Sequence, residues 1–317
     1  MTQTLHISFE FFAAKTEQGR KNLLKSCQKL SAYNPDFYSV TYGAGGSTRD
    51  TTKQLVLDIQ QLGFQAAPHL SFGGDTQEAV LSLINDYKEV GISNLVALRG
   101  DLPSGIGGAG QLVHANELVA LIREQTGDHF DINVAAYPEI HPEAESYSRD
   151  IYWLGEKFKA GADRAITQYF YNPDAYFKFL DNCHKVGIDK PIVPGIMPLT
   201  NYQNLVRFSD NCGAEIPRWL RWQLMEKSEQ GDDLIKYGLD VVSKLCETLL
   251  AGGAPGLHFY TMNLAVAVTQ ILKGLGMIPK NSQRQLPWIG RERNAKEDVR
   301  PIFWSQREAS YLSRSSN

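Results

Sequence analysis

Several apolar runs in this chain of 317 residues end abruptly in polar or charged side chains. In LVALRGDLP, from Leu95 to Pro103, the apolar residues stop at Arg99, Gly100 and Asp101. Another run places Glu10 between two phenylalanines. A carboxyl group inside an apolar strand is costly unless it is paired or protonated, so we expect Glu10 to be functional and its pKa to be raised.

The apolar runs recur with the spacing of β-strand and α-helix units. The first six gaps between strand starts are each about 30 residues long, the length of one βα unit. Eight such units predict a closed (β/α)8 barrel, formed by residues 1–280 as a single domain. The predicted strands are 6–12, 37–42, 65–70, the run from Leu95, 131–137, 164–169, 191–196 and 257–260. The predicted helices are 16–32, 49–62, 76–90, 114–125, 150–159 and 173–186, with one extra helix near 216–229 in the long seventh gap.

In such a barrel the carboxyl ends of the strands converge on one mouth, where catalytic groups are found. The chain presents Glu10, Thr41, His69, Asp101, Tyr137, Gln168 and Tyr260 at these ends. Each residue also has a structural explanation, such as an ion pair between Arg99 and Asp101 or a hydrogen bond of a loop histidine. Their convergence, rather than any single residue, predicts a polar pocket.

Three chemistries can be compared with this set of side chains. A Schiff-base aldolase needs a lysine at a strand end, and none of the predicted ends carries one. His69, Glu139, His141 and Asp101 form only a diffuse set of metal ligands, so we predict no metal site, although a metal-dependent barrel hydrolase or lyase remains an alternative. The loop GAGGST, residues 43–48, lacks the spacing of the known phosphate-binding motifs.

Composition and charge favour small-molecule partners. The net charge is −3 and 43% of the residues are hydrophobic, with no basic stripe of the kind that binds nucleic acid. The four cysteines are far apart in the sequence and form no CxxC motif, which indicates reduced core thiols. No apolar run is long enough to cross a membrane and no leader is recognisable, so we expect a cytoplasmic protein.

The segment from Asn281 onward differs in composition from the barrel. Its sequence LPWIGRERNAKEDVRPIFW is charged but carries Trp288, Ile302, Phe303 and Trp304. Disordered tails are usually poor in aromatic residues, so we expect residues 281–317 to pack on the barrel as a C-terminal extension.

Eight motifs at the predicted strand ends, in order along residues 6 to about 276, closely resemble the methylenetetrahydrofolate reductase family. The segment EDVRPIFW also resembles the end of the catalytic domain in longer, eukaryotic-type members. The eight motifs are SFEFF from Ser8, VTYGAGG from Val40, AAPHL from Ala66, ALRGDLP from Ala97, AAYPEIHPEA from Ala135, GADRAITQYFY from Gly161, PGIMP from Pro194 and HFYTMN from His258.

The resemblance implies a (β/α)8 barrel that holds FAD and reduces 5,10-methylenetetrahydrofolate to 5-methyltetrahydrofolate with NAD(P)H, one substrate following the other at a shared site. Glu10 is then the general acid, and Asp101 lies beside the flavin and the folate pterin. The substrate and nicotinamide contacts implied are Gln168, Phe208, Tyr260 and Thr41. The FAD contacts implied are Thr41, Tyr42, Ala44, His69, Arg99, Gly100, Asp101, Ala115, Tyr137, His141, Ala144, Asp150 and Lys157.

Three positions depart from the family pattern. Trp153 and Glu156 stand where bacterial members have polar or basic side chains, and Leu264 replaces an arginine that often follows the HFYTxN motif. On a helix that begins at Asp150, Trp153 would share a face with Asp150 and Lys157. We therefore predict that Trp153 stacks on the FAD adenine; the alternative is that it packs on a neighbouring helix.

The resemblance leaves several functions open. A methyltetrahydrofolate oxidase would run the same chemistry in reverse, and a non-catalytic flavin- or folate-binding barrel would share the fold, because fold alone does not fix function. The presence of Glu10, Asp101 and Gln168 together favours an enzyme over a binding protein. A homo-oligomer is implied by the resemblance, whereas the choice between NADH and NADPH is not.

Overall fold

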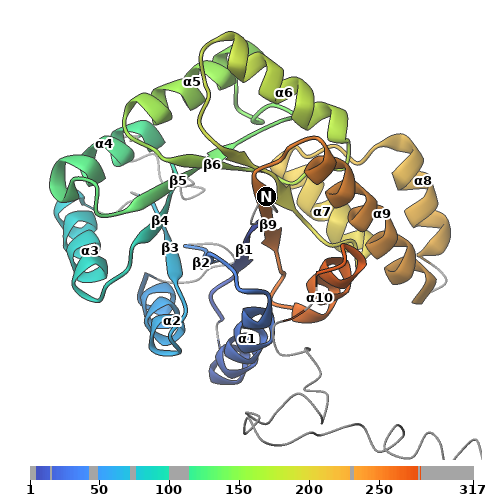
Figure 1. Cartoon of the computed structure of the whole chain (residues 1–317), viewed down its shortest axis with the longest axis horizontal. Helices are drawn as coiled ribbons and strands as arrows, with labels where there is room; N and C mark the ends of the chain where they lie inside the picture. Colours follow the sequence, from blue (N-terminus) through green and yellow to red (C-terminus); the bar gives the residue numbers. More distant parts are fainter. Residues whose placement is uncertain are drawn as a thin grey trace, which may run out of the picture. The chain divides into compact units, whose positions relative to one another are not determined.

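A computed structural model describes residues 5–14, 16–42, 49–71, 76–99, 114–228, 232–277 and 279. Residues Met1–Lys280 form one compact unit, and the segment 281–317 lies outside the described residues. In this unit a ring of helices surrounds a sheet of parallel strands (Figure 1). The predicted (β/α)8 barrel is confirmed for the described part of the chain.

The strands follow one another around the sheet, with the first and last strands of the chain adjacent. The hydrogen-bonded order is β7-β6-β5-β4-β3-β2-β1-β9-β8, and every pairing is parallel. Several strands are buried along their whole length, as expected for a parallel sheet that is covered by helices. The strands are β1 (His6–Phe11), β2 (Phe37–Val40), β3 (Ala66–Leu70), β4 (Asn94–Ala97), β5 (Asp131–Ala136), β6 (Arg164–Thr167), β7 (Ile192–Val193), β8 (Gly195–Ile196) and β9 (Gly256–Tyr260).

The expected seventh strand, 191–196, is divided in two at Pro194. Because proline has no backbone N–H, it interrupts the ladder. The part before it, β7, pairs with β6, and the part after it, β8, pairs with β9. The carbonyl of Pro194 accepts the His258 N–H at 3.0 Å, so the two parts together bring β6 and β9 to opposite sides of one broken strand.

The helices cover the outside of the strands, and several begin at a side chain that caps the first turn. Thr16, Thr76, Ser146, Asn172 and Asn201 each accept a backbone N–H at the start of a helix. The helices are α1 (Glu17–Leu30), the short 3-10 helix η1 (Ser31–Tyr33), α2 (Arg49–Gln61), α3 (Gln77–Glu89), α4 (Ala115–Thr126), α5 (Tyr147–Lys159), α6 (Pro173–Lys185), α7 (Tyr202–Cys212), α8 (Arg218–Lys227), α9 (Asp232–Ala251) and α10 (Ala265–Gly274).

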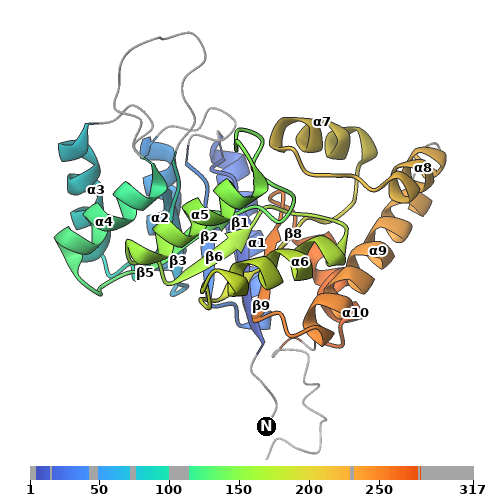
Figure 2. The same ribbon diagram turned by 90° about the horizontal axis from the view of Figure 1, so that it is seen from above.

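Two helix predictions need correction. The helix expected to begin at Asp150 begins at Tyr147, because the Ser146 side chain accepts the Arg149 N–H and caps it there. The extra helix expected near 216–229 is confirmed as α8, but the long seventh gap also holds α7, which was not predicted. Figure 2 shows α7 lying across one end of the barrel, apart from the ring of helices around its wall.

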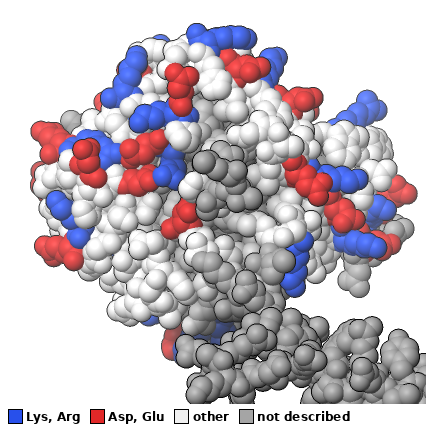
Figure 3. Space-filling view, in the orientation of Figure 1, with Lys and Arg blue, Asp and Glu red and all other residues white. Residues whose placement is uncertain are grey.

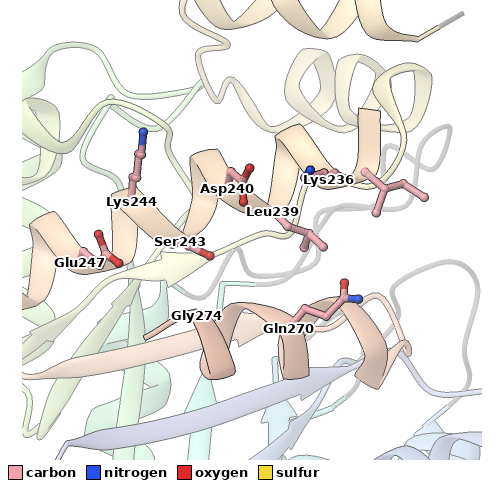
Figure 4. A pocket seen from close by; sticks show the side chains of 9 residues that line it. Lys236, Leu239, Asp240, Ser243, Lys244, Glu247, Gln270 and Gly274 are labelled. Atoms are coloured by element: carbon pink, nitrogen blue, oxygen red, sulfur yellow. The ribbon is translucent and has the colours of Figure 1, made fainter. Parts of the chain in front are cut away.

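Neither the described helices nor the face shown in Figure 3 carries a membrane-spanning segment or a strongly basic patch. No helix in the described ranges is long and apolar enough to cross a membrane. On the face shown in Figure 3, lysine and arginine side chains alternate with aspartate and glutamate around the rim. A shallow groove of about 660 Å³ runs between α9 and α10, and its charged lining alternates in sign along α9 (Figure 4). This groove lies on the outer wall, away from the carboxyl ends of the strands.

Gly195 allows close contact at the broken strand. A Cβ at this position would lie 2.1 Å from the Thr167 carbonyl oxygen and 2.6 Å from Cε2 of Tyr260. We predict that Gly195→Ala lowers the free energy of unfolding by about 1–3 kcal/mol, as measured by urea denaturation, because backbone and ring must both shift.

Gly155→Ala is the matched control. It lies inside α5, and its Cβ would meet Ile188 at an ordinary 3.5 Å. Because alanine is the better helix former, this variant should be neutral or more stable than the wild type. If Gly195→Ala is as stable as the wild type, the broken strand can accommodate a Cβ atom at position 195 and the prediction is wrong.

Candidate active site

A cavity of about 470 Å³ opens at the carboxyl ends of the strands, as predicted. Its walls combine apolar strand residues with polar groups from the strand ends, and one side is closed by the C-terminal half of α7. The lining residues that matter here are Glu10, His69, Val96, Leu98, Arg99, Val134, Ala135, Tyr137, His141, Ile166, Gln168, Tyr169, Phe208, Asn211, Cys212, Tyr260 and Met262.

Glu10 lies in this cavity between two imidazoles. Its Oε2 atom is 3.2 Å from His69 Nε2 and 3.4 Å from His258 Nε2. The His69 contact has the distance of an ion pair but lacks hydrogen-bond alignment, whereas His258 also hydrogen-bonds Ser8 Oγ through Nδ1 at 2.7 Å. The side chain of Glu10 is 12% exposed and that of His258 is fully buried. The three residues come from β1, β3 and β9, so only the closed barrel brings them together.

The backbone on both sides of Glu10 is tied to the exit of β9. The Thr261 hydroxyl donates to the Glu10 carbonyl at 2.6 Å, and the Asn263 amide both accepts the Phe12 N–H and donates to its carbonyl, at 2.8 and 2.9 Å. Met262 and Asn263 have positive φ angles of 51° and 61°, an uncommon conformation for side chains other than glycine. The strained turn thus fixes the strand end that carries Glu10.

The predicted raised pKa of Glu10 is wrong. Burial does raise it, but the charge of His69 and the hydrogen bond and charge of His258 outweigh burial and lower the pKa to about 2. The sequence prediction failed because it considered Glu10 only among apolar neighbours in its own strand. The carboxyl also raises the pKa of the neighbouring Tyr260 hydroxyl, which burial already raises well above its usual range.

The loop after β5 and the start of α5 form a second polar group of residues. The Asp150 carboxylate accepts the His141 N–H at 2.9 Å, and Tyr137 contacts the His141 ring edge-on with centroids 4.5 Å apart. Lys157 donates from Nζ to the Ala135 carbonyl at 2.8 Å. Burial lowers the pKa of Lys157 to about 8, although Asp150 opposes this shift.

Arg99 leaves the end of β4 toward the same loop. Its guanidinium forms an ion pair with the Glu143 carboxylate at 2.5 Å. Among the described residues, its ion-pair partner therefore comes from the loop after β5 and not from the end of β4. Ala144 is held in this loop by a hydrogen bond from its N–H to the His141 carbonyl at 2.9 Å. Arg99 thus lines the cavity on the side formed by β4 and β5, and Lys157 bonds to the carbonyl of Ala135, which lines the same side.

Trp153 lies between two neighbours rather than on an empty surface. Its ring stacks on His114, with centroids 5.0 Å apart and planes 14° from parallel, and the Arg149 guanidinium carbon lies 5.1 Å from its centroid. His114 is the N-cap residue of α4, and the buried Ala115 follows it. The contact with His114 agrees with the alternative in which Trp153 packs on a neighbouring helix, and the residue is half-buried.

Gln168, Phe208 and Tyr260 line the opposite side of the cavity. The Tyr260 hydroxyl donates to the Thr167 carbonyl at 2.7 Å, which fixes its ring beside His258. Phe208 reaches the cavity from α7. Thr41 is buried at the end of β2 and its hydroxyl has no partner among the described residues, while Tyr42 follows it half-buried.

Three of the predicted site residues, Ala44, Gly100 and Asp101, lie outside the described residues, so their predicted roles are not tested. Sequence analysis did not single out His258 or Ser8. A signal was present, because residues two apart on a strand face the same side. Ser8 therefore shares a face with Glu10, and His258 shares one with Tyr260.

The described residues fit a flavin on structural grounds. Val96, Leu98 and Ala135 provide an apolar wall of the kind that a flat ring system needs. The Thr41 hydroxyl and His69 Nε2 are buried polar atoms without an aligned hydrogen bond, and Arg99 and Lys157 provide positive charge. No group of three or more metal-ligating side chains in the described ranges could hold a metal ion.

Fold and site together define a (β/α)8-barrel protein with a buried carboxylate–imidazole centre at the carboxyl ends of its strands. The family model described as "Methylenetetrahydrofolate reductase" matches residues 1–276. The chain belongs to this family, which is generally flavin-dependent.

Relatives from bacteria and plants support this assignment. The chain is 38% identical to the 5,10-methylenetetrahydrofolate reductase of Escherichia coli (strain K12), over 87% of this chain and 92% of that protein. It is 40% identical to methylenetetrahydrofolate reductase (NADH) 1 of Arabidopsis thaliana, over 97% of this chain and 55% of that protein. The chain thus spans about half the length of the plant relatives that it matches.

One solved structure shows the same fold. It covers 86% of this chain and 94% of its own, with a TM-score of 0.56 and 18% identity, and its title describes an uncharacterized protein from Clostridium thermocellum that binds two copies of 5-methyl-5,6,7,8-tetrahydrofolic acid. At this identity the likeness shows the fold alone.

The position of Glu10 between two imidazoles gives a prediction about its titration. Because the charge of His69 is the largest influence that opposes burial, His69→Gln should raise the pKa of Glu10. Carbon-13 NMR of labelled glutamate, with Glu10→Gln to identify the signal, measures this directly. His184→Gln changes an exposed histidine on α6 and should leave the titration unchanged. If the pKa of Glu10 in the wild type lies at or above the usual range of a glutamate, the two imidazoles do not lower it and the prediction is wrong.

Proposed function

We propose that the protein reduces 5,10-methylenetetrahydrofolate to 5-methyltetrahydrofolate with NAD(P)H, using bound FAD. The observation that carries this proposal is the buried contact of Glu10 with His69 and His258 in a cavity that also contains Gln168, Phe208 and Tyr260. Family membership and the Escherichia coli relative, which is matched over nearly its whole length, support the same activity.

The flavin, when bound, supplies the hydride-transfer chemistry, and the protein supplies orientation and proton transfer. Thr41, Tyr42, His69, Arg99, Tyr137, His141 and Lys157 would hold the flavin. We propose that Ala115, Ala144, Asp150 and Trp153, with Ala44 and Gly100, complete this set. Asp101 would place negative charge near the cation that develops on the folate and stabilise it.

The folate needs a proton before it can accept hydride. Opening of its five-membered ring requires protonation at N10, and general acids contribute to such steps when they lie within hydrogen-bond reach. Glu10 is the group at the cavity surface, and both imidazoles contact its Oε2 atom. We therefore propose that the proton reaches the folate through the Glu10 carboxyl, which the two imidazoles orient.

The two substrates would use the same side of the cavity in turn. Phe208 offers a ring for stacking from α7, Gln168 offers an amide at the end of β6, and Tyr260 is fixed by its bond to Thr167. A flat aromatic surface with an adjacent amide can accept both a nicotinamide and a pterin. A homo-oligomeric state and a cytoplasmic location remain predictions from the sequence.

An absorbance spectrum followed by anaerobic mixing tests the proposed function. The purified protein should be yellow, should bleach on addition of NADH or NADPH, and should regain its colour when methylenetetrahydrofolate is added. A protein that bleaches but is not reoxidised by the folate would contradict the reductase activity. A protein that binds 5-methyltetrahydrofolate but never becomes reduced would favour a binding function.

Replacing the acid should separate the two half-reactions. We predict that Glu10→Gln leaves flavin reduction by the nicotinamide nearly intact and slows reoxidation by methylenetetrahydrofolate about 100-fold or more, the size expected for loss of a general acid. Stopped-flow absorbance measures both steps. Equal losses in both half-reactions would show that Glu10 has another role.

Trp153 allows a test of how FAD is retained. Its ring already contacts His114 and the Arg149 guanidinium, so adenine would have to displace one of these two side chains to stack on it. We predict that Trp153→Ala weakens FAD binding to the apo-protein by about 1 kcal/mol, as measured by fluorescence titration.

The control for this test is Tyr152→Ala, because Tyr152 is the adjacent, 46% exposed aromatic residue that the Arg149 guanidinium also covers. It should bind FAD like the wild type. If Trp153→Ala changes only the melting temperature, the residue serves packing between α4 and α5.

A further inference from the structure

Glu139 is a partly buried carboxyl group in the loop after β5 that the proposed chemistry does not use. Its Oε2 atom accepts the Glu215 N–H at 2.7 Å, and Oε1 is buried without a partner among the described residues. The next residue, Ile140, has a φ of 72°, which is a strained conformation for a β-branched side chain. A strained loop with a carboxyl aimed at a distant backbone amide indicates a specific role.

A second contact joins the same loop to the same segment. Gly213 ends α7 with a φ of 71°, and a Cβ there would lie 2.8 Å from Cγ of Pro142. Glu139 and Pro142 on the loop thus contact Glu215 and Gly213 just beyond α7. These two contacts connect the loop that carries His141 with the helix that carries Phe208.

Along its length the helix α7 packs on the core through one face, where Tyr202, Val206, Phe208 and Cys212 are partly buried. Leu205 and Ser209 are its buried residues, and the Ser209 hydroxyl lies 3.1 Å from the Tyr169 hydroxyl. On the same side Cys212 donates from Sγ to the Tyr169 hydroxyl at 3.3 Å. These contacts lie along the helix, whereas the Glu139–Glu215 hydrogen bond and the Pro142–Gly213 contact hold the residues just beyond its C-terminal end.

We propose that Glu139 is a positioning residue that holds the C-terminal end of α7, and with it Phe208, against the cavity. Its effect on catalysis rests on the proposed function, whereas its effect on α7 does not. Glu139 holds the backbone N–H of Glu215. Position 139 therefore needs a hydrogen-bond acceptor but does not need a negative charge.

The electrostatic surroundings of Glu139 agree with this role. Burial raises the pKa of the carboxyl to about 7, the hydrogen bond from Glu215 opposes the shift, and the Glu215 charge adds to it. The Glu139 charge in turn raises the pKa of Tyr169 and of Tyr171, which follow β6. Because the folded pKa lies above the ordinary 4.5, the neutral acid favours folding and its contribution is lost as pH rises from about 4.5 to 7.

Hydrogen exchange measured by mass spectrometry tests the proposal without reference to activity. In Glu139→Ala, peptides that cover residues 202–216 should exchange about 5-fold faster, as expected for loss of one hydrogen bond, while peptides from the strands stay protected. Glu139→Gln keeps an acceptor oxygen and should resemble the wild type. Glu145→Ala removes an exposed glutamate of the same loop and is the matched control.

Kinetics and stability provide two further readouts. In Glu139→Ala the KM for the nicotinamide and for the folate should rise about 5-fold with kcat nearly unchanged, because one hydrogen bond positions Phe208 for both. The melting temperature of Glu139→Gln relative to the wild type should be higher at pH 8 than at pH 5, since the glutamine cannot ionise.

The outcomes separate this proposal from the proposed function. Unchanged exchange over 202–216 in Glu139→Ala, or faster exchange throughout the barrel, would overturn the positioning role. Equally fast exchange in Glu139→Gln and Glu139→Ala would overturn the requirement for an acceptor. If the wild-type protein does not reduce the folate, the proposed function fails, and the exchange comparison still decides whether Glu139 holds α7.

Discussion

The contact of Glu10 with two imidazoles depends on closure of the barrel more than on any local feature of the chain. His69 comes from β3 and His258 from β9, and both approach the same carboxylate oxygen. If one imidazole were removed, the Glu10 carboxylate would keep the full energetic cost of burial but would lose part of the interaction that offsets this cost. The parallel register that places β1 between β2 and β9 is therefore also what makes an ionised Glu10 tolerable at this depth.

The barrel is closed by a strand that is broken in two. Pro194 divides the seventh strand, so that β7 pairs with β6 and β8 pairs with β9. The break allows the Tyr260 ring to approach Gly195 and to donate to the Thr167 carbonyl. A regular strand with a side chain at position 195 would occupy the space of that ring. The irregularity thus serves the site, because it brings Tyr260 and His258 into place at the end of β9.

The sequence was sufficient to predict the barrel, because eight apolar runs at regular spacing allow few other folds. It also predicted that Glu10, His69, Gln168 and Tyr260 meet at one cavity, since strand ends of a barrel converge. The pKa of Glu10 could not be predicted in this way. Its value depends on distances between side chains about 59 and 248 positions apart, and only three-dimensional register sets those distances. The N-terminus of α5 was missed for a local reason, the Ser146 cap.

The cavity has two kinds of wall, a floor of strand ends and the helix α7. The floor is made of strand ends joined by hydrogen bonds such as those of Asn263 to Phe12, whereas α7 packs on the core through one face and lies across one end of the barrel. A pocket that must accept a nicotinamide and then a pterin benefits from this division, because proton transfer requires fixed distances and exchange of two flat ligands requires one wall that can adjust. Phe208 belongs to the adjustable wall and Glu10 to the fixed one, so substrate exchange need not disturb the group that provides the proton.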